Sequence, residues 1–149
     1  MIRTRLLAAG KISRSSFYDL QNFYLKRLSP KPDIIEIDIK SSFTISAVTE
    51  AYEAVIKSDH PLILCDEQGQ NLNSEQFAHD LKKLAETSGK QIQFVIGEAN
   101  GIPEKIKNMS IKKISFGRMT WPHLMARILL MEQLYRAQTI LENHPYHRA

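Results

Sequence analysis

The sequence predicts an α/β protein built on a mainly parallel sheet, and three observations support this prediction. Segments with strand-like and helix-like patterns alternate along the whole chain, as they do in α/β layer folds. Residues 61–69, PLILCDEQG, begin with a continuous apolar run, which is typical of a strand buried on both faces of a parallel sheet. The chain has 149 residues, a length suited to one core, so residues 1–149 are expected to form one domain.

The first half of the chain contains two further expected strands and two expected helices. IRTRLLAAG, residues 2–10, predicts a buried strand. DIIEIDIK, residues 33–40, alternates isoleucine with acidic residues in the two-residue period of a strand. Residues 13–29 place large apolar side chains at helical spacing, and residues 46–58 predict a second helix.

Residues 73–89 form the clearest helix pattern of the sequence. Asn73 and Gln76 have the spacing of a capping box at its start. Gly89 follows the last periodic residue, where glycine commonly ends a helix. Both ends of this helix are therefore predicted from local signals.

The remaining elements alternate in the same way. IQFVIG, residues 92–97, predicts a fourth strand, and a weak helix and a short strand around KKISF come next. Residues 121–143 predict a long last helix with Pro122 in its first turn, where proline is tolerated.

Composition restricts the classes of function. The formal charge is +4 and the pI is about 9.2, which favours a polyanionic partner such as RNA only weakly. The single cysteine, Cys65, excludes an internal disulfide and fits a reducing cytoplasm. No run of 18 apolar residues is present, so no membrane span is expected. The histidines and the cysteine lack metal-ligand spacing, so no metal site is expected.

Three loops are expected at the carboxyl ends of the strands, where open α/β sheets bind ligands: CDEQG, GEANG and FGRMT. The glycines of GEANG allow backbone N–H groups to approach a nucleotide-like ligand. Neither a P-loop nor the three-glycine dinucleotide fingerprint is present, and an ordinary turn remains the alternative. In FGRMT, Thr120 has the position of a helix N-cap.

The last helix carries hardly any polar side chains in its first two turns, residues 124–131. A helix that is apolar all round is buried on more than one side. One face is expected on the sheet and the other on a second subunit, which predicts a homodimer. Arg127 and Arg136 then need carboxylate partners or a place at the rim of the interface.

Residues 115–149, SFGRMTWPHLMARILLMEQLYRAQTILENHPYHRA, resemble the C-terminal segment of the RlmH-type methyltransferases of the SPOUT superfamily. The shared features are Thr-x-Pro-His at the start of the helix, Leu-Tyr-Arg-Ala inside it, and an ending of the form His-Pro-Tyr-His. FVIGEANG is similar to the strand and glycine loop of the family, and LCDEQG to its Leu-Asp-x-x-Gly loop. The order and spacing agree along the whole chain.

The resemblance implies a SPOUT-type parallel sheet flanked by helices, with a deep trefoil knot at its C-terminal end. It implies S-adenosyl-L-methionine as cofactor and a homodimer formed through the C-terminal helix. The implied reaction is methylation of N3 of a pseudouridine in large-subunit (23S) ribosomal RNA, on the assembled ribosome in the cytoplasm.

The cofactor loops of the family carry over by position. The implied cofactor-binding residues are Leu64, Cys65, Gly97, Glu98, Gly101, Gly117, Arg118, Met119, Thr120, Trp121 and Pro122. Glu98 is a departure, because the family usually has a second glycine there. Its side chain either crowds the cofactor or binds the cofactor's ribose or amino group. If the position requires positive φ, the substitution adds strain of about 1 kcal/mol.

The tail NHPYHRA supplies the expected catalytic residues His147, Arg148 and Tyr146. The N3–H of pseudouridine is a weakly acidic imide and must lose its proton to become nucleophilic. His147 is expected to assist this deprotonation or to orient the base, and Arg148 and Tyr146 to grip RNA. In the alternative, all three only position the tail. Other basic residues that could contact ribosomal RNA are Arg3, Arg5, Lys11, Arg14, Lys26 and Arg27.

Three other functions remain open from the sequence. A catalytically impaired ribosome-binding or assembly factor of the same fold is one, and Glu98 is the argument for it. A SPOUT methyltransferase with a different RNA target or acceptor atom is another. The third is a flavodoxin-like nucleotide-binding module, which leaves the tail and the last helix unexplained.

Overall fold

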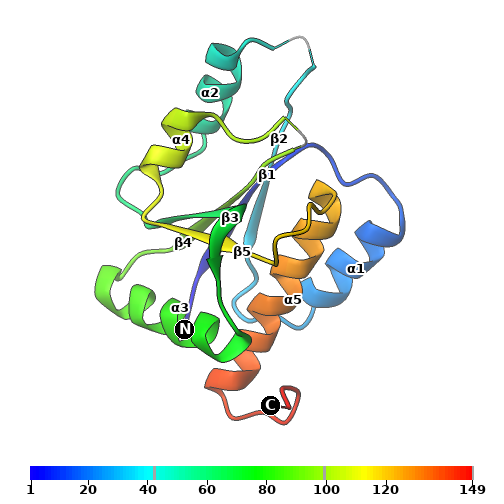
Figure 1. Ribbon diagram of the computed structural model, residues 1–149. Coiled ribbons are helices and arrows are strands. Elements are labelled where there is room, and N and C mark those ends of the chain that lie inside the picture. Colours follow the sequence, from blue (N-terminus) through cyan, green and yellow to red (C-terminus); the bar gives the residue numbers. More distant parts are fainter. Residues whose placement is uncertain (42, 99, 149) are drawn as a thin grey trace.

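A five-stranded sheet with helices on both faces organises the computed structural model, which describes residues 1–41, 43–98 and 100–148 (Figure 1). The strand order is β2-β1-β4-β3-β5 and every neighbouring pair is parallel. The expected α/β class with a parallel sheet is therefore confirmed. The elements are β1 (Thr4–Ala9), α1 (Ser16–Leu25), β2 (Asp33–Ile37), α2 (Ile45–Glu53), β3 (Leu62–Asn71), α3 (Ser74–Ser88), β4 (Ile92–Ile96), α4 (Glu104–Met109), β5 (Lys112–Ser115) and α5 (His123–Leu141).

The sheet has an apolar core on each of its two faces, because side chains alternate along a strand. Ile92, Phe94 and Ile96 of β4 belong to the core under α1, α3 and α5. Val95 belongs to the core under α2 and α4, together with Tyr52. In Figure 1, α2 and α4 lie on one side of the sheet and α1, α3 and α5 on the other.

Local signals fix the ends of α3 as expected. The Asn73 side chain accepts a hydrogen bond from the Gln76 backbone N–H at 2.8 Å, and the Gln76 side chain accepts one from the Asn73 N–H at 2.9 Å. Gly89 adopts the left-handed conformation at φ 63°. The capping box and the glycine C-cap are therefore both confirmed.

The start of α5 differs from the expectation. Pro122 is the N-cap and the helix begins at His123, so the prediction that Thr120 caps this helix is wrong. The Thr120 hydroxyl instead donates a hydrogen bond to Glu67 at 2.7 Å. The bond ties the loop before α5 to the loop after β3, an interaction between segments far apart in the sequence.

β3 continues beyond the expected apolar run and meets β5 twice. Cys65 and Gln70 are both in register with Ile114, so the four residues between them leave the ladder and the strand then pairs with β5 again. A Cβ atom on Gly69 would lie 2.7 Å from the backbone of Ile114. Only glycine allows this close approach of two backbones.

An ionic contact of the buried Arg127 with Glu36 anchors α5 to the rest of the fold. Arg127 is 1% exposed and donates to Glu36 at 2.8 Å and to the Gly10 carbonyl at 3.1 Å. Arg136 pairs with Glu132 at 2.6 Å. The expectation that both arginines find partners is confirmed, and the buried pair fixes α5 against the carboxyl ends of β1 and β2. Among the described residues, no helix is long and apolar enough to cross a membrane.

Candidate active site

The loops expected to bind a ligand leave the sheet at one edge. Cys65 of β3 is in register with Ile96 of β4 and with Ile114 of β5. The three neighbouring strands therefore end at the same level, and the segments that follow them are brought together. Ligands of open α/β sheets bind at such an edge, so the structure supports this choice of loops.

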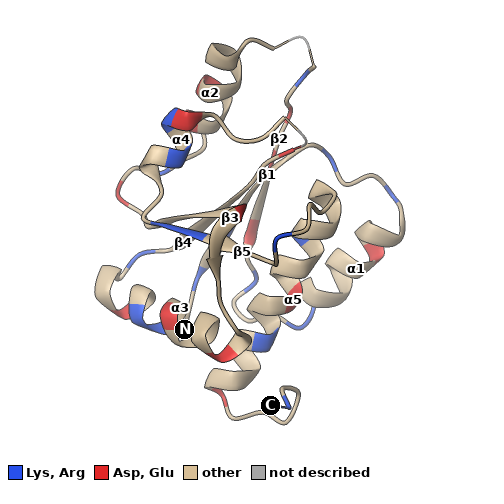
Figure 2. Cartoon of the chain, in the orientation of Figure 1, with Lys and Arg blue, Asp and Glu red and all other residues tan. Residues whose placement is uncertain are grey.

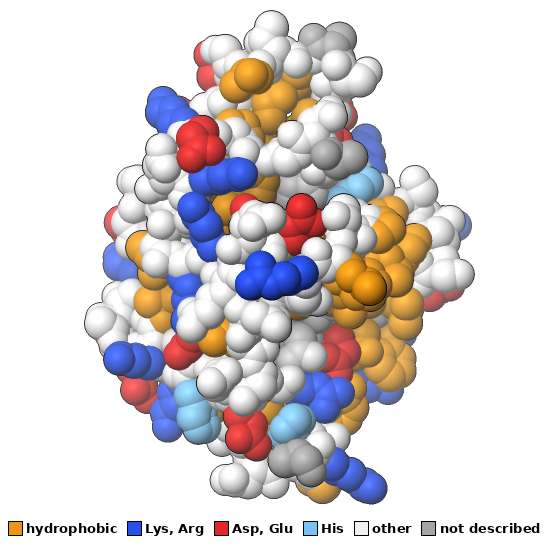
Figure 3. All heavy atoms as spheres, viewed as in Figure 1, with side chains coloured by type: hydrophobic (Ala, Val, Ile, Leu, Met, Phe, Trp, Pro, Cys, Tyr) orange, Lys and Arg blue, Asp and Glu red, His pale blue; other side chains and the backbone are white. Residues whose placement is uncertain are grey.

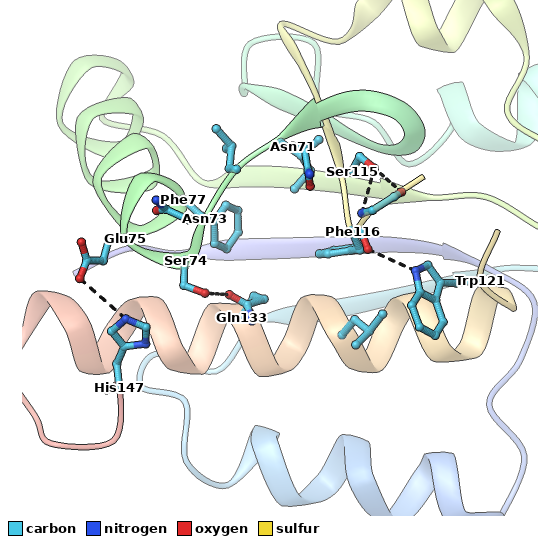
Figure 4. A pocket seen from close by; sticks show the side chains of 14 residues that line it. Asn71, Asn73, Ser74, Glu75, Phe77, Ser115, Phe116, Trp121, Gln133 and His147 are labelled. Atoms are coloured by element: carbon cyan, nitrogen blue, oxygen red, sulfur yellow. Dashed lines mark hydrogen bonds and ion pairs between the residues drawn. The ribbon is translucent and has the colours of Figure 1, made fainter. Parts of the chain in front are cut away.

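A cavity of about 640 Å³ opens beside this edge, between β3, β5, α3 and α5 (Figure 4). Its volume lies within the range of about 300–1,000 Å³ that is usual for ligand pockets. Trp121 lies at one end and His147 with Glu75 at the other, as Figure 4 shows. The lining residues are Asn71, Leu72, Asn73, Ser74, Glu75, Phe77, Ile114, Ser115, Phe116, Gly117, Trp121, Leu129, Gln133 and His147.

The loop after β5 supplies the expected cofactor residues that reach this cavity, Gly117 and Trp121. Ser115 fixes the turn, because its hydroxyl donates to the Gly117 carbonyl at 2.5 Å and accepts from the Gly117 N–H at 3.1 Å. Trp121 Nε1 donates to the Phe116 carbonyl at 3.3 Å. Gly117 has φ 107° and no atom lies within 4 Å of a Cβ placed on it. Glycine is therefore required there for its backbone conformation, and the space beside it is open.

The other expected cofactor residues are not among those that line the cavity. Arg118, Met119, Thr120 and Pro122 are exposed on the same loop. The Leu64 side chain is fully buried in the core under α2 and α4, so a ligand would meet its backbone only.

Cys65 is an unreactive thiol in this environment. Burial raises its pKa to about 12, with a smaller contribution from the charge of Asp66. The thiol therefore stays protonated at neutral pH, and a nucleophilic role at this position is not supported.

The glycine loop after β4 is held as a tight turn. The Gly101 N–H donates to the Glu98 carbonyl at 2.8 Å, and Gly101 has φ 79°. Among the described residues other than glycine, positive φ occurs at Asn143. Glu98 therefore sits in an ordinary backbone conformation, and the strain considered from the sequence is absent.

The Glu98 side chain is not among those that line the cavity. Burial raises the pKa of the Tyr52 hydroxyl, and the charge of Glu98 raises it further. Tyr52 is fully buried in the core under α2 and α4, on the opposite side of the sheet from α3 and α5. Glu98 is not among the residues that line the cavity, and the same holds for Gly97 and Gly101 of its loop.

The C-terminal tail is folded back on α5 and ordered by several contacts. Asn143 turns the chain at φ 56°, and the His144 N–H donates to the Thr139 carbonyl at 2.8 Å. The Tyr146 ring packs edge-on against Tyr135 with the centroids 4.7 Å apart. These contacts deliver His147 to the cavity, whereas Arg148 is exposed.

The tyrosine of the tail is a hydrogen-bond donor. Its hydroxyl donates to Glu132 at 3.0 Å. Burial and this bond raise the pKa of Tyr146 to about 12. At neutral pH the phenol therefore keeps its proton, which excludes Tyr146 as a base.

Sequence reasoning missed much of the cavity wall. Asn71 enters it because β3 rejoins β5, and Ser74 and Gln133 face each other across it with a hydrogen bond of 2.8 Å. The capping pattern at Asn73 predicts the start of α3, and this helix start forms one wall of the cavity. No local pattern predicts the crossing that places Asn71.

One basic residue assigned to RNA from the sequence belongs to the interior. Arg5 is buried and donates to the Val55 carbonyl at 3.0 Å and to Gln93 at 2.7 Å. The expectation that it contacts RNA is wrong, because its guanidinium is buried and bonded to the segment between α2 and β3 and to β4.

A parallel sheet whose last three strands share ligand loops, with a C-terminal tail entering the adjoining cavity, corresponds to a SPOUT-type methyltransferase. Residues 2–147 match the family described as predicted SPOUT methyltransferases, and the chain belongs to this family.

Similar proteins span the same length as this chain. The chain is 39% identical over 98% of its length to Ribosomal RNA large subunit methyltransferase H of Prochlorococcus marinus (strain MIT 9211), of which it covers 96%. It is 35% identical to the protein of that name from Paramagnetospirillum magneticum, with 99% of both chains covered. The protein of that name from Bradyrhizobium diazoefficiens is 36% identical over 99% of this chain and all of its own length.

The family uses S-adenosylmethionine as methyl donor, and the residues present fit such a group. Gly101 and Gly117 both hold positive φ with open space beside them, as close backbone approach to a ligand requires. Phe77 and Trp121 give the cavity apolar walls, and Ser115 and Gln133 give it polar ones. Apolar walls with few polar groups are usual for cofactor sites.

Proposed function

We propose that this chain methylates N3 of a pseudouridine in large-subunit (23S) ribosomal RNA, on the assembled ribosome in the cytoplasm, with S-adenosylmethionine as donor. The observation that carries the proposal is the joint lining of one cavity by Gly117 and Trp121 of the β5 loop and by His147 of the tail. The names of the similar proteins support a large-subunit ribosomal RNA as substrate. The pseudouridine N3 target rests on the resemblance of the tail.

The chain's own residues would bind and orient the reactants. The bound cofactor supplies an electrophilic methyl group on a sulfonium. Gly117 and Trp121, which line the cavity, would hold it, and the resemblance adds backbone groups of Leu64, Gly97 and Gly101. In-line transfer requires mainly that the nucleophile be held opposite the methyl group. The rigid turn at Ser115 and Gly117 suits this task, because it is fixed by two hydrogen bonds.

The tail is proposed to serve RNA binding and catalysis together. Arg148 is exposed and free to meet a phosphate. Tyr146 is a donor held beside Glu132. Lys and Arg are distributed over most elements of the fold together with Asp and Glu (Figure 2). Because the net charge of +4 is modest, the ribosome itself would supply much of the shape that selects the target.

A homodimer through α5 is part of the proposal. Large apolar side chains are exposed on α1 and around the start of α5, and Figure 3 shows an apolar patch over this side of the molecule. They are Tyr18, Leu20, Phe23, Met119, Trp121 and Met125. Monomeric proteins rarely leave such a patch uncovered, and a second copy is the commonest cover.

Residues 1–149 are proposed to form one SPOUT domain with the C-terminal trefoil knot of that fold. The match of residues 2–147 to the SPOUT family supports the knot. The interpretation as a catalytically impaired assembly factor loses one of its arguments, since Glu98 does not strain the backbone.

Calorimetric titration with S-adenosylmethionine tests the cofactor site, and a pair of glycine variants makes the test specific. Gly117→Ala and Gly89→Ala both place a Cβ in open space at positive φ, so both should lose about 1 kcal/mol of unfolding free energy. Gly89 lies at the end of α3, away from the cavity. Cofactor affinity should fall for Gly117→Ala alone, and an equal fall in both variants would contradict the assigned loop.

Methyl transfer to ribosomes that lack the modification tests the reaction. Nucleosides from the digested large-subunit RNA, separated by mass spectrometry, should contain N3-methylpseudouridine after incubation with the enzyme and cofactor. Methyl groups found only on a ribose 2′-oxygen would replace the proposed acceptor. Cofactor binding with no transfer to any ribosomal RNA would overturn the proposed activity.

A further inference from the structure

A hydrogen-bonded cluster on α5 holds the tail, and Glu132 is its centre. One carboxylate oxygen of Glu132 accepts from Arg136 Nε at 3.0 Å, from Arg136 Nη2 at 2.6 Å and from the Tyr146 hydroxyl at 3.0 Å. The other oxygen accepts from Gln133 Nε2 at 2.8 Å. Gln133 in turn accepts from the Ser74 hydroxyl at 2.8 Å. The carboxylate therefore joins the tail, α5 and the start of α3.

Arg136 connects Glu132 to His147. Arg136 Nη1 lies 3.1 Å from His147 Nδ1. A guanidinium has hydrogens on all its nitrogens and no acceptor. Nδ1 must therefore accept with its lone pair, and in the neutral ring the hydrogen sits on Nε2. Glu132 fixes Arg136 through two bonds, so the tautomer of His147 is set by residues outside the tail.

The protonated nitrogen faces the cavity. His147 lines the cavity, and its Nε2 lies 3.8 Å from a carboxylate oxygen of Glu75. That distance is too long for a hydrogen bond, so Nε2–H remains available to a ligand. In Figure 4 the His147 ring projects from the tail toward Glu75, at the end of the cavity opposite Trp121.

We infer that Glu132 and Arg136 are positioning residues that lock His147 as the Nε2–H tautomer, so that His147 meets the substrate as a hydrogen-bond donor and not as a base. The acceptor chemistry is a carbonyl oxygen next to the reacting imide nitrogen. This identification of the acceptor rests on the proposed function. The tautomer itself rests only on the contacts of Arg136.

The reaction then balances without a histidine base. The imide N3–H gives its proton to water, and the negative charge spreads onto the flanking carbonyl oxygens. His147 Nε2–H donates to one of these oxygens and keeps its proton. The N3 lone pair forms the new N–C bond to the methyl group, while the S–C bond breaks and its electron pair stays on sulfur. Stabilising a developing oxyanion with a fixed donor contributes about 100-fold to a rate.

Nitrogen NMR of the histidine side chains tests the tautomer directly. Long-range correlation spectra of the ¹⁵N-labelled protein should show His147 with Nε2 protonated and Nδ1 as a bare, pyridine-type nitrogen. Arg136→Met removes the donor and should give averaged shifts from both tautomers. Arg136→Lys should restore part of the ordered pattern. His79 is exposed on α3 and provides an internal control whose signals stay unchanged.

A wild-type spectrum with hydrogen on Nδ1 would overturn the inference, as would a spectrum unchanged by Arg136→Met. Neither result depends on any methyl transfer. If the enzyme fails to methylate ribosomes but the tautomer is found, the proposed function fails and the positioning role of Arg136 stands.

Steady-state kinetics on ribosomes separates a donor from a base. His147→Ala should lower kcat about 100-fold. The amide nitrogen of glutamine reaches close to the position of Nε2 and donates, so His147→Gln should recover roughly tenfold of that loss. Asparagine places its amide nearer to Nδ1 and should recover none. Arg136→Met should lower kcat with little change in KM. The substitution misplaces the His147 ring but does not change the residues proposed to bind RNA.

Equal losses in His147→Gln and His147→Ala would contradict the donor role. Glutamine can donate a hydrogen bond but cannot act as a base, so equal losses would indicate that His147 acts as a base. Circular dichroism and the cofactor titration show that each variant is folded and binds cofactor before its kcat is compared.

Discussion

The C-terminal tail and the glycine loop after β4 are both expected site segments, yet they are held in place differently. Side chains hold the tail: Tyr146 and His147 bond to Glu132 and Arg136 on α5. The backbone holds the glycine loop, through the Gly101 N–H bond to the Glu98 carbonyl and the positive φ of Gly101. Substitutions that remove polar atoms should therefore damage the tail, and substitutions that restrict φ should damage the loop.

Glu132→Ala should give the largest loss. It removes the acceptor of three hydrogen bonds that reach Arg136 and Tyr146. Bonds to a charged group contribute about 1.5–3 kcal/mol each when buried, and this cluster is partly exposed. We expect the unfolding free energy to fall by about 2 kcal/mol, with faster amide exchange in residues 143–148. Glu142→Ala, at the exposed C-cap of the same helix, is the control and should change stability little.

Gly101→Ala should have the next largest effect and should leave the tail intact. No atom of the described residues lies within 4 Å of the added Cβ, so the expected cost is that of φ 79°. An L-residue in this conformation costs about 1–2 kcal/mol. Denaturant titration should show that loss, while exchange in residues 143–148 stays as in the wild type. A destabilised tail in this variant would show that the two regions are coupled.

Tyr146→Phe isolates one bond of the tail. It keeps the ring contact with Tyr135 at 4.7 Å and the position of the Arg136 guanidinium over the ring at 4.8 Å. The lost hydroxyl bond should reduce the unfolding free energy by about 1 kcal/mol.

The pH dependence of that difference gives a second check. The pKa of Tyr146 is raised from 10.0 to about 12, first by burial and then by the bond to Glu132. A raised pKa means that the folded state favours the protonated phenol. The contribution is therefore complete below pH 10 and is lost as the pH rises toward about 12. The stability difference between wild type and Tyr146→Phe should shrink over this range, and a constant difference would contradict the bond.

The comparison also explains what the sequence could and could not predict. The strands at 4–9, 62–65 and 92–96 and both ends of α3 follow from local patterns of apolar residues and caps. The motif resemblance identified the Gly117 loop and the tail. The second pairing of β3 with β5 and the bond between Thr120 and Glu67 join distant segments. They depend on the folded path of the chain, so no local pattern contains them.

The side-chain contacts of the tail could not be predicted from local patterns either. Glu132 and Arg136 are four residues apart on α5, and that spacing alone predicts an ordinary surface ion pair. Their role appears only when His147, eleven positions after Arg136, returns to the same helix. Arg5 shows the opposite case. Its charge predicted a position on the surface, but it is buried and donates to Gln93.

Glu98→Gly should have the smallest effect, and it tests whether the departure from the family matters. The turn depends on the Glu98 backbone carbonyl, which glycine retains. The Glu98 side chain is not among those that line the cavity. Cofactor affinity should therefore change by less than about threefold, or about 0.7 kcal/mol. Stability should fall by about 0.5–1 kcal/mol from the added freedom of the unfolded chain. A tenfold gain in affinity in the calorimetric titration would instead mean that the glutamate turns toward the cofactor when it binds, and the loop would then be held by its side chain as the tail is.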